Sequence, residues 1–184
     1  MLVQVVLAVQ TVKYQNGKFK LKYAITGHSY GIGEALYNRL DSIGFSKSTG
    51  HDIHDSNIRK QIIEASSDCD VFINNAPAGF AQSHLLLELW HAWRDTDKTI
   101  INVGSRIAQP NFDLPMEYNH LLRYQMHKRT LKQLSETLSA LDTPVTVKYR
   151  WFAYVGTPKI LAKYPHFTEN DYISIDEAVE IILA

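Results

Sequence analysis

Hydrophobic residues along this chain follow two patterns: short continuous runs, and stripes spaced three or four residues apart. The runs predict buried strands and the stripes predict helices with one apolar face. The expected strands cover residues 19–25, 45–48, 51–55, 69–73, 99–103 and 145–151. The expected helices cover the stretch from about residue 31 to Gly44, residues 56–65, 81–94 and 116–141, and a last helix capped at Ser174, with residues 153–170 as loop or short helix. Because strands alternate with helices, we expect one α/β domain with a doubly wound parallel sheet.

A β-hairpin extension is expected ahead of this domain. Hydrophobic residues alternate loosely from Val3 to Val9, and Asn16-Gly17 is a strong signal for a two-residue hairpin turn. We interpret residues 1–20 as a strand and hairpin that add to the sheet or form an oligomer contact.

Length and composition narrow the possible functions. A chain of 184 residues can bury a core without metals or disulfides, and 19 basic against 19 acidic residues give no excess positive charge for nucleic acid. Cys69 has no cysteine partner, and residues 2–9 are too short to span a bilayer and lack a signal peptide's basic leader. A cytoplasmic protein is therefore expected. His51 and His54 have no partners at a metal-binding spacing, so no metal site is expected.

A glycine-rich turn joins the strand before Thr26 to the helix after it. Gly27, Gly31 and Gly33 are spaced G-xxx-G-x-G, which differs from the usual dinucleotide-binding G-x-G-x-x-G. Glycine permits a sharp turn and a close ligand approach, and the amides at the helix start favour a phosphate. Taken alone, the turn fits phosphate binding and an ordinary strand-to-helix connection equally well.

Small and polar residues occur where the expected strands end, which is the edge where open parallel sheets bind ligands. These positions are Thr26-Gly27, Asp52-Ile53, Asn74-Asn75-Ala76, Gly104-Ser105 and residues 154–157.

Tyr124 and Lys128 lie four residues apart on the long helix, so their side chains share one face. A lysine beside a phenol lowers the tyrosine pKa, and such a tyrosine can pass a proton to a carbonyl oxygen. Ser105 can hydrogen-bond the same oxygen. The alternative is an exposed helical pair with a small structural role.

In combination, these motifs resemble the short-chain dehydrogenase/reductase family. The turn at residues 26–33, Asn74-Asn75-Ala76, Ser105 and Tyr124-xxx-Lys128 occur in the family's order, and residues 154–157 resemble its nicotinamide-side loop. The resemblance covers about residues 20–184. It implies a Rossmann-type fold, a nicotinamide dinucleotide and hydride transfer to or from a carbonyl carbon.

The resemblance also implies a role for each matching residue. Tyr124 is implied as the general acid/base, Lys128 as the group that lowers its pKa and holds the nicotinamide ribose, and Ser105 as the group that polarises the carbonyl. The other implied cofactor contacts are Gly27, Ser29, Tyr30, Gly31, Ile32 and Gly33 at the pyrophosphate and adenosine side, Asp52 and Ile53 at the adenine, Asn74 and Ala76 at the adjacent ribose, and Val155 and Thr157 at the carboxamide.

The chain departs from the family pattern near the substrate side. The interval from Ser105 to Tyr124 is long, and Tyr118 would shorten it, but residue 122 is Leu rather than Lys, so Tyr124 is preferred. The region before Ser105 is short, and the family's helix asparagine has no clear counterpart. Gln82 is expected to cap its helix or face solvent rather than to substitute for that asparagine.

Cofactor choice depends on the end of the second strand, where an acid binds the ribose of NAD and a base accepts the 2′-phosphate of NADP. This chain reads Ser46-Lys47-Ser48-Thr49 there, and Lys47 favours NADP over NAD. The alternative is a solvated lysine. Tyr30 stands where NADP-preferring relatives often carry a basic residue in the glycine turn, which weakens this preference.

We therefore expect an NADP-dependent carbonyl reductase or alcohol dehydrogenase that acts on a small carbonyl or alcohol. Two alternatives stay open: a non-enzymatic NADP(H)-binding sensor, and a sugar-nucleotide epimerase or reductase, for which the short C-terminal part leaves little room. Related enzymes associate through helices that here carry Leu85–Trp93 and Leu131–Leu141, so a homodimer or homotetramer is expected. No nucleic-acid or membrane partner is expected.

Overall fold

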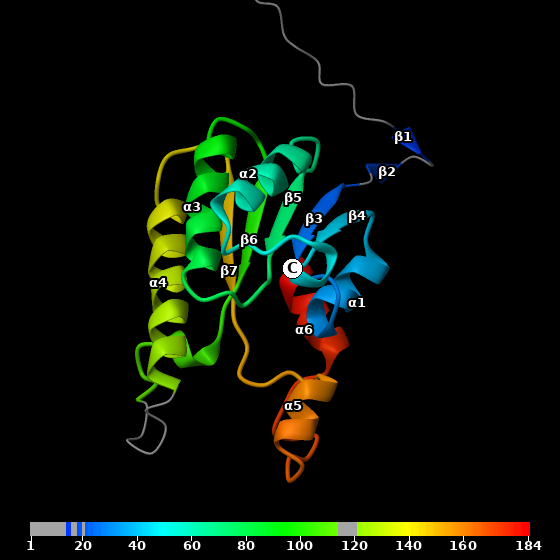
Figure 1. Cartoon of the computed structure of the whole chain (residues 1–184), viewed down its shortest axis with the longest axis vertical. Helices are drawn as coiled ribbons and strands as arrows, with labels where there is room; N and C mark the ends of the chain where they lie inside the picture. Colours follow the sequence, from blue (N-terminus) through cyan, green and yellow to red (C-terminus); the bar gives the residue numbers. More distant parts are fainter. Residues whose placement is uncertain (1–13, 16–17, 20, 114–120) are drawn as a thin grey trace, which may run out of the picture.

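A computed structural model describes residues 14–15, 18–19, 21–113 and 121–184 of the chain (Figure 1). In this part of the chain, five parallel strands form one sheet in the order β4-β3-β5-β6-β7, and two short strands form a separate antiparallel pair. The strands are β1 (Tyr14–Gln15), β2 (Lys18–Phe19), β3 (Tyr23–Thr26), β4 (Ser42–Phe45), β5 (Val71–Asn74), β6 (Thr99–Val103) and β7 (Thr146–Arg150). The helices are α1 (Gly31–Arg39), α2 (Ser56–Ala65), α3 (Ala81–Trp93), α4 (Leu122–Ser139), α5 (Pro158–Lys163) and α6 (Ile175–Leu183), with 3₁₀ turns η1 (Lys47–Thr49) and η2 (Arg106–Ala108).

Helices cover both faces of the sheet (Figure 1). Successive strand residues point to opposite faces, so Phe72 and Ile73 of β5 enter two different hydrophobic clusters. One cluster packs Phe72 against Leu85 of α3 and Leu131 of α4, while the other packs Ile73 with Ile182 of α6. The predicted doubly wound parallel sheet is confirmed.

The winding of the chain reverses next to β3. This strand pairs with β4 on one side and with β5 on the other, and all its neighbours run parallel to it. In open α/β sheets such a reversal opens a crevice at the carboxyl ends of the strands, where ligands bind. The strand order therefore predicts a ligand site at the carboxyl ends of β3, β5 and β6.

The helix predicted to end at Gly44 is shorter. It ends at Arg39, because Leu40 takes an extended conformation with φ −109° and ψ 156°. Ile43, which extends the helical spacing of apolar residues, instead lies on β4 and pairs with Ala24 of β3. The strand predicted at residues 45–48 is likewise wrong, because those residues end β4 and enter η1.

The strand predicted at residues 51–55 is also wrong, because this segment forms turns. Its backbone is stabilised by a side chain instead of a neighbouring strand. Nη1 of Arg59 on α2 donates to the carbonyl oxygens of Ile53, at 2.9 Å, and His54, at 3.2 Å. The predicted start of α2 is confirmed, since Asp55 caps it by accepting from the backbone NH of Asn57 at 2.8 Å.

The predicted strand over residues 19–25 divides into two, since β2 ends at Phe19 and β3 begins at Tyr23. The pairing of β1 with β2 agrees with the predicted hairpin, while Asn16-Gly17 and the apolar residues from Val3 to Val9 lie outside the described residues. Of the predicted long helix, the structure describes α4, whereas Met116 lies outside the described residues.

Most of the apolar residues expected at an oligomer interface pack inside one chain, while Leu87 and Leu141 are exposed. Leu85, Leu89 and Trp93 of α3 and Leu131 of α4 are buried in the core against the sheet. The buried side chains are therefore not available for association, and the homodimer or homotetramer stays a prediction. No helix in the described part of the chain is both long and apolar enough to cross a bilayer.

Candidate functional site

A cavity of about 680 Å³ lies at the carboxyl ends of β3, β5 and β6, and this volume is within the usual range for ligand sites. The predicted site residues that line it are Gly27, Ser29, Tyr30, Gly31, Ile32, Lys47, Asp52, Ile53, Ala76, Ser105, Tyr124, Lys128, Val155 and Thr157. Gly33 and Asn74 do not line it. The chain therefore brings nearly all of the predicted site into one cavity.

The glycine turn contains backbone conformations that residues other than glycine rarely adopt. Gly27 and Gly31 have φ of 72° and 59°, in the left-handed region that glycine favours. Gly33 lies behind the turn, where a Cβ would be 2.0 Å from the carbonyl oxygen of Gly27. Gly33 therefore allows α1 to pack closely under the turn, although it was predicted to contact a cofactor.

Tyr30 joins the glycine turn to the first turn of α5. Its hydroxyl accepts a hydrogen bond from the backbone NH of Lys159 at 2.6 Å. Thr157 caps α5 by accepting from the backbone NH of Ile160 at 3.4 Å, and a Cβ on Gly31 would meet Thr157 Cγ2 at 3.1 Å. The turn and the predicted nicotinamide-side loop thus line one cavity and contact each other directly.

A charged group forms the wall of the cavity after β4. Lys47 Nζ lies 2.9 Å from Asp52 Oδ2, and His54 Nδ1 lies 2.8 Å from Asp52 Oδ1. The pKa of Asp52 is held well below its usual range, first by Lys47 and then by His54. Lys47, the predicted partner of the 2′-phosphate, is therefore already paired with the carboxylate of Asp52.

Asn75 and Ala76 are fixed to the end of β3. Their backbone NH groups donate to Oγ1 of Thr26 at 3.0 and 3.2 Å, and Asn75 Nδ2 donates to the carbonyl oxygen of Thr26 at 3.1 Å. These hydrogen bonds place Ala76 at the cavity. They also set the path of the chain from β5 into α3.

Asn74 was predicted to contact a ribose, but its side chain faces away from the cavity into the protein. It is fully buried, and its Nδ2 donates to the carbonyl oxygen of Gln82 at 2.9 Å and to Asn102 Oδ1 at 3.0 Å. The residue therefore ties β5 to α3 and β6 beneath the cavity.

Ser105 and Tyr124 both line the cavity. Ser105 follows β6, and its backbone NH donates to the hydroxyl of Tyr149 at 3.4 Å. Burial raises the pKa of Tyr124 above its ordinary value near 10, and the hydrogen bond with Ser105 lowers it in part. Tyr118, the alternative to Tyr124, lies outside the described residues.

Lys128 is buried next to this pair, but its ammonium group does not lower the pKa of Tyr124 as predicted. Its Nζ donates to Gln82 Oε1 at 2.8 Å and to the carbonyl oxygen of Val103 at 3.1 Å, and lies 5.9 Å from the centre of the Tyr124 ring. Burial lowers the pKa of Lys128 to about 8. The effect of burial on Tyr124 outweighs any effect of the lysine, because the ammonium is directed to other partners.

The prediction that Gln82 caps its helix or faces solvent is wrong. Gln82 is 1% exposed, so it neither faces solvent nor caps α3. The sequence does contain a signal for the burial of Gln82. The residue precedes Leu85, Leu86 and Leu89 by three, four and seven residues, which places it on the apolar face of α3. A polar residue on a buried stripe must find internal hydrogen-bond partners.

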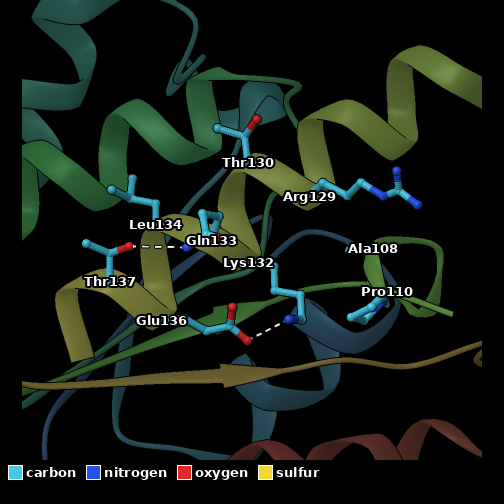
Figure 2. Close-up of a pocket in the computed structure, with 9 residues that line it drawn as sticks. All are labelled: Ala108, Pro110, Arg129, Thr130, Lys132, Gln133, Leu134, Glu136 and Thr137. Atoms are coloured by element: carbon cyan, nitrogen blue, oxygen red, sulfur yellow. Dashed lines mark hydrogen bonds and ion pairs between the residues drawn. The ribbon is translucent and has the colours of Figure 1, made fainter. Parts of the chain in front are cut away.

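A second cavity, of about 620 Å³, lies along α4 and is shown in Figure 2. Its polar side chains bond to one another: Lys132 Nζ donates to Glu136 Oε1 at 2.6 Å, and Gln133 Nε2 donates to Thr137 Oγ1 at 3.5 Å. None of the predicted site residues is among those that line it. The predicted catalytic and cofactor-binding residues therefore lie at the strand ends and not in this second cavity.

The sheet order and the cavity at the strand ends define a Rossmann-type α/β protein with the fold of short-chain dehydrogenases/reductases. Solved structures with this fold include a small-chain dehydrogenase in complex with NADPH, which is 14% identical, has a TM-score of 0.69 and aligns over 89% of this chain and 90% of its own. A short-chain dehydrogenase from Burkholderia cenocepacia in complex with NADP is 19% identical, with a TM-score of 0.69 over 89% of this chain and 83% of its own.

The 3-alpha-hydroxysteroid dehydrogenase from Pseudomonas sp. B-0831, solved with NADH, is 20% identical and has a TM-score of 0.56 over 88% of both chains. No protein-family profile matches the sequence, and no curated protein does. At these identities the likeness establishes the fold.

Proposed function

We propose that this chain is a short-chain dehydrogenase/reductase that interconverts a small carbonyl compound and its alcohol, with NADP(H) as the preferred cofactor. The observation that carries the proposal is that Ser105, Tyr124 and Lys128 line the same cavity as the glycine turn. The complexes of similar folds with NADPH, NADP and NADH support a nicotinamide cofactor.

The residues that line the cavity suit a dinucleotide. Glycines stand where the backbone turns, and the turn leads into the start of α1, where backbone amides favour a phosphate. Gly31 and Ile32 would hold the pyrophosphate, Lys47 the 2′-phosphate, and Val155 and Thr157 the carboxamide. Asp52 and Ile53 would flank the adenine, and Ala76 the adjacent ribose.

The cofactor, when bound, would supply the hydride that adds to the carbonyl carbon during reduction. The chain itself would supply the proton, which passes from the Tyr124 hydroxyl to the carbonyl oxygen and leaves a phenolate. Ser105 would donate a hydrogen bond to the same oxygen. Because burial raises the pKa of Tyr124, its hydroxyl stays protonated at neutral pH, as a proton donor for reduction must be.

Apolar residues form part of the cavity lining, beside charged residues such as Lys159. Pro77, Ala78, Phe152, Ala153 and Ile160 line the cavity and carry no charge. We therefore expect a small carbonyl compound with an apolar part.

The test is NADPH oxidation against a broad panel of aldehydes and ketones, with Tyr124→Phe as the variant. This change removes the proton donor, so it should lower kcat by roughly 10²- to 10⁴-fold while the affinity for NADPH stays nearly unchanged. The matched control is Tyr23→Phe, the same change at the opposite end of β3 from the cavity. Equal turnover by Tyr124→Phe and the native protein would refute the mechanism.

One observation favours a second function, an NADP(H)-binding sensor without turnover. The Lys128 ammonium is directed to Gln82 and the Val103 carbonyl rather than to the Tyr124 hydroxyl. A sensor would bind NADPH tightly, leave the whole carbonyl panel unreacted, and change its affinity for a partner when NADPH binds. Turnover of any carbonyl that is lost in Tyr124→Phe would exclude it.

A further inference from the structure

Beneath the cavity lies a buried group of hydrogen bonds that converges on Gln82, in the first turn of α3. The side-chain Nε2 donates to the carbonyl oxygens of Asn74, at 2.8 Å, and Val103, at 3.2 Å. Its Oε1 accepts from Lys128 Nζ at 2.8 Å. One amide thus connects the ends of β5 and β6 with α4, and all three connections lie within the protein.

Gln82 is itself fixed in position. Its carbonyl oxygen accepts from Nδ2 of Asn74, which also donates to Asn102 Oδ1. The side chains of Asn74 and Gln82 thus each bond the backbone of the other residue, so α3 begins at a defined distance from β5. A helix held in this way can place a side-chain oxygen precisely where the lysine needs an acceptor.

Lys128 depends on these neutral acceptors. It is 4% exposed, and its ammonium group donates to the amide oxygen of Gln82 and the carbonyl oxygen of Val103. The titratable groups nearby are Tyr124 and His127 on its own helix, and Tyr149 on β7, which interacts with Tyr124. From α3 and β6 it meets Gln82 and Val103, which do not titrate.

We propose that Gln82 is a positioning residue that holds the Lys128 ammonium against the end of β6 and so sets where its positive charge lies relative to Tyr124 and the cavity. This inference rests on the proposed function, because it assigns Gln82 to the same site. The residue acts through Lys128 and does not touch the reacting atoms.

The experiment follows the titration of Lys128 by NMR of the isotopically labelled lysine side chain, in the full chain without added cofactor. Gln82→Glu keeps the shape and the acceptor for Lys128 but replaces the donor to the Asn74 and Val103 carbonyl oxygens. It also adds a negative charge, which should raise the pKa of Lys128 from about 8 toward the ordinary lysine value. Gln82→Met removes the acceptor and should lower the pKa of Lys128 below the native value. At pH 9 the protonated fraction of Lys128 should rise from about one tenth to most of the molecules in Gln82→Glu.

Ser83→Ala is the matched control. Ser83 is 4% exposed in the same turn of α3, and within the described part of the chain its hydroxyl has no hydrogen-bond partner. It should leave the Lys128 titration unchanged. An unchanged titration in Gln82→Glu, or an equal shift in Ser83→Ala, would overturn the inference, and because Gln82→Glu is isosteric it tests the proposal even if Gln82→Met fails to fold.

The two proposals fail separately, because the titration does not depend on turnover. A shifted Lys128 pKa in a protein that reduces no carbonyl would refute the proposed function and keep the positioning role. An unshifted Lys128 pKa in a protein that reduces carbonyls would refute the positioning role of Gln82 and keep the proposed function. In an active protein, the pH at which NADPH affinity falls should move in the same direction as the Lys128 pKa.

Discussion

Arg59 of α2 and Glu88 of α3 form a bidentate ion pair, with Arg59 Nε 2.9 Å from Oε2 and Nη2 2.8 Å from Oε1. Arg59 is 7% exposed, and the same guanidinium bonds the backbone of Ile53 and His54. A single planar side chain thus connects two helices and stabilises the segment that carries Asp52 and Ile53 into the cavity.

Arg59→Met should therefore lower both stability and cofactor affinity. The change leaves two backbone carbonyls and one carboxylate without their donor, and Glu88 is partly exposed, so we expect a loss of about 2–3 kcal/mol in the free energy of unfolding. Urea unfolding measures this loss, and fluorescence titration measures the NADPH affinity. Lys60→Met, the exposed neighbour on α2, is the control and should change neither. Native stability in Arg59→Met would mean that residues 51–55 hold their shape without Arg59.

Gly33→Ala tests the close packing of α1 under the glycine turn. A Cβ at this position would lie 2.0 Å from the Gly27 carbonyl oxygen, so the helix or the turn must move. We expect a loss of roughly 1–3 kcal/mol in stability and weaker NADPH binding, because the turn then no longer presents its amides as before. Glu34→Ala, one residue along on the exposed side of α1, should leave both measurements near native. Binding and stability like those of the native protein in Gly33→Ala would disprove the packing role.

Lys47 and Asp52 should act in opposite directions on cofactor choice. Lys47→Ala removes the expected partner of the 2′-phosphate, so the affinity for NADPH should fall about tenfold while that for NADH changes little. Asp52→Asn frees Lys47 from its 2.9 Å ion pair and removes a negative charge beside the phosphate, so NADPH should bind more tightly. Paired titrations with both cofactors measure the ratio. If Lys47→Ala weakened both cofactors equally, Lys47 would not read the phosphate.

The burial of Lys128 should make stability depend on pH. The pKa of its ammonium is about 8 in the folded protein against 10.5 ordinarily, so the unfolded chain binds more protons between these values. The free energy of unfolding should therefore rise with pH across this window, by about 3 kcal/mol in total. Below pH 8 the contribution of this lysine should be constant.

Lys128→Met isolates that contribution. The variant keeps Cys69 and Tyr149, whose raised pKa values act at similar pH, so their effects cancel in the difference between the two proteins. The stability of the native protein relative to Lys128→Met should increase from pH 8 to pH 10.5. A difference that stays level across this range would show that Lys128 titrates as an ordinary lysine.

Local signals in the sequence predicted most of the fold. The apolar run at residues 99–103 and the helical spacing over residues 56–65 predicted β6 and α2 with the observed bounds, because both patterns depend on residues close together in the chain. The segment at residues 51–55 was misread, because its conformation depends on Arg59 and not on a neighbouring strand. Ile43 was misread for a related reason: its apolar character suits the helical stripe as well as strand pairing with β3.

The site was predictable as far as the strand ends and the Tyr124-xxx-Lys128 spacing determine it. Ser105, Tyr124 and Lys128 do line one cavity. The partner of Lys128 was not predictable from spacing, because Gln82 lies 46 residues away and no local pattern links the two. The pKa of Tyr124 was misjudged for the same reason, since burial and the direction of the lysine ammonium are tertiary properties.

Cys69 provides the protein with its own reporter of local opening. It is the single cysteine of the sequence, is 5% exposed in the core just before β5, and has a thiol whose pKa is raised by burial. A thiol reagent can therefore react only when this part of the sheet opens transiently, and the labelling rate measures how often that happens. Because β5 leads directly into the segment that carries Ala76, slower labelling when a nucleotide is added would show that binding at one end of the strand suppresses opening at the other.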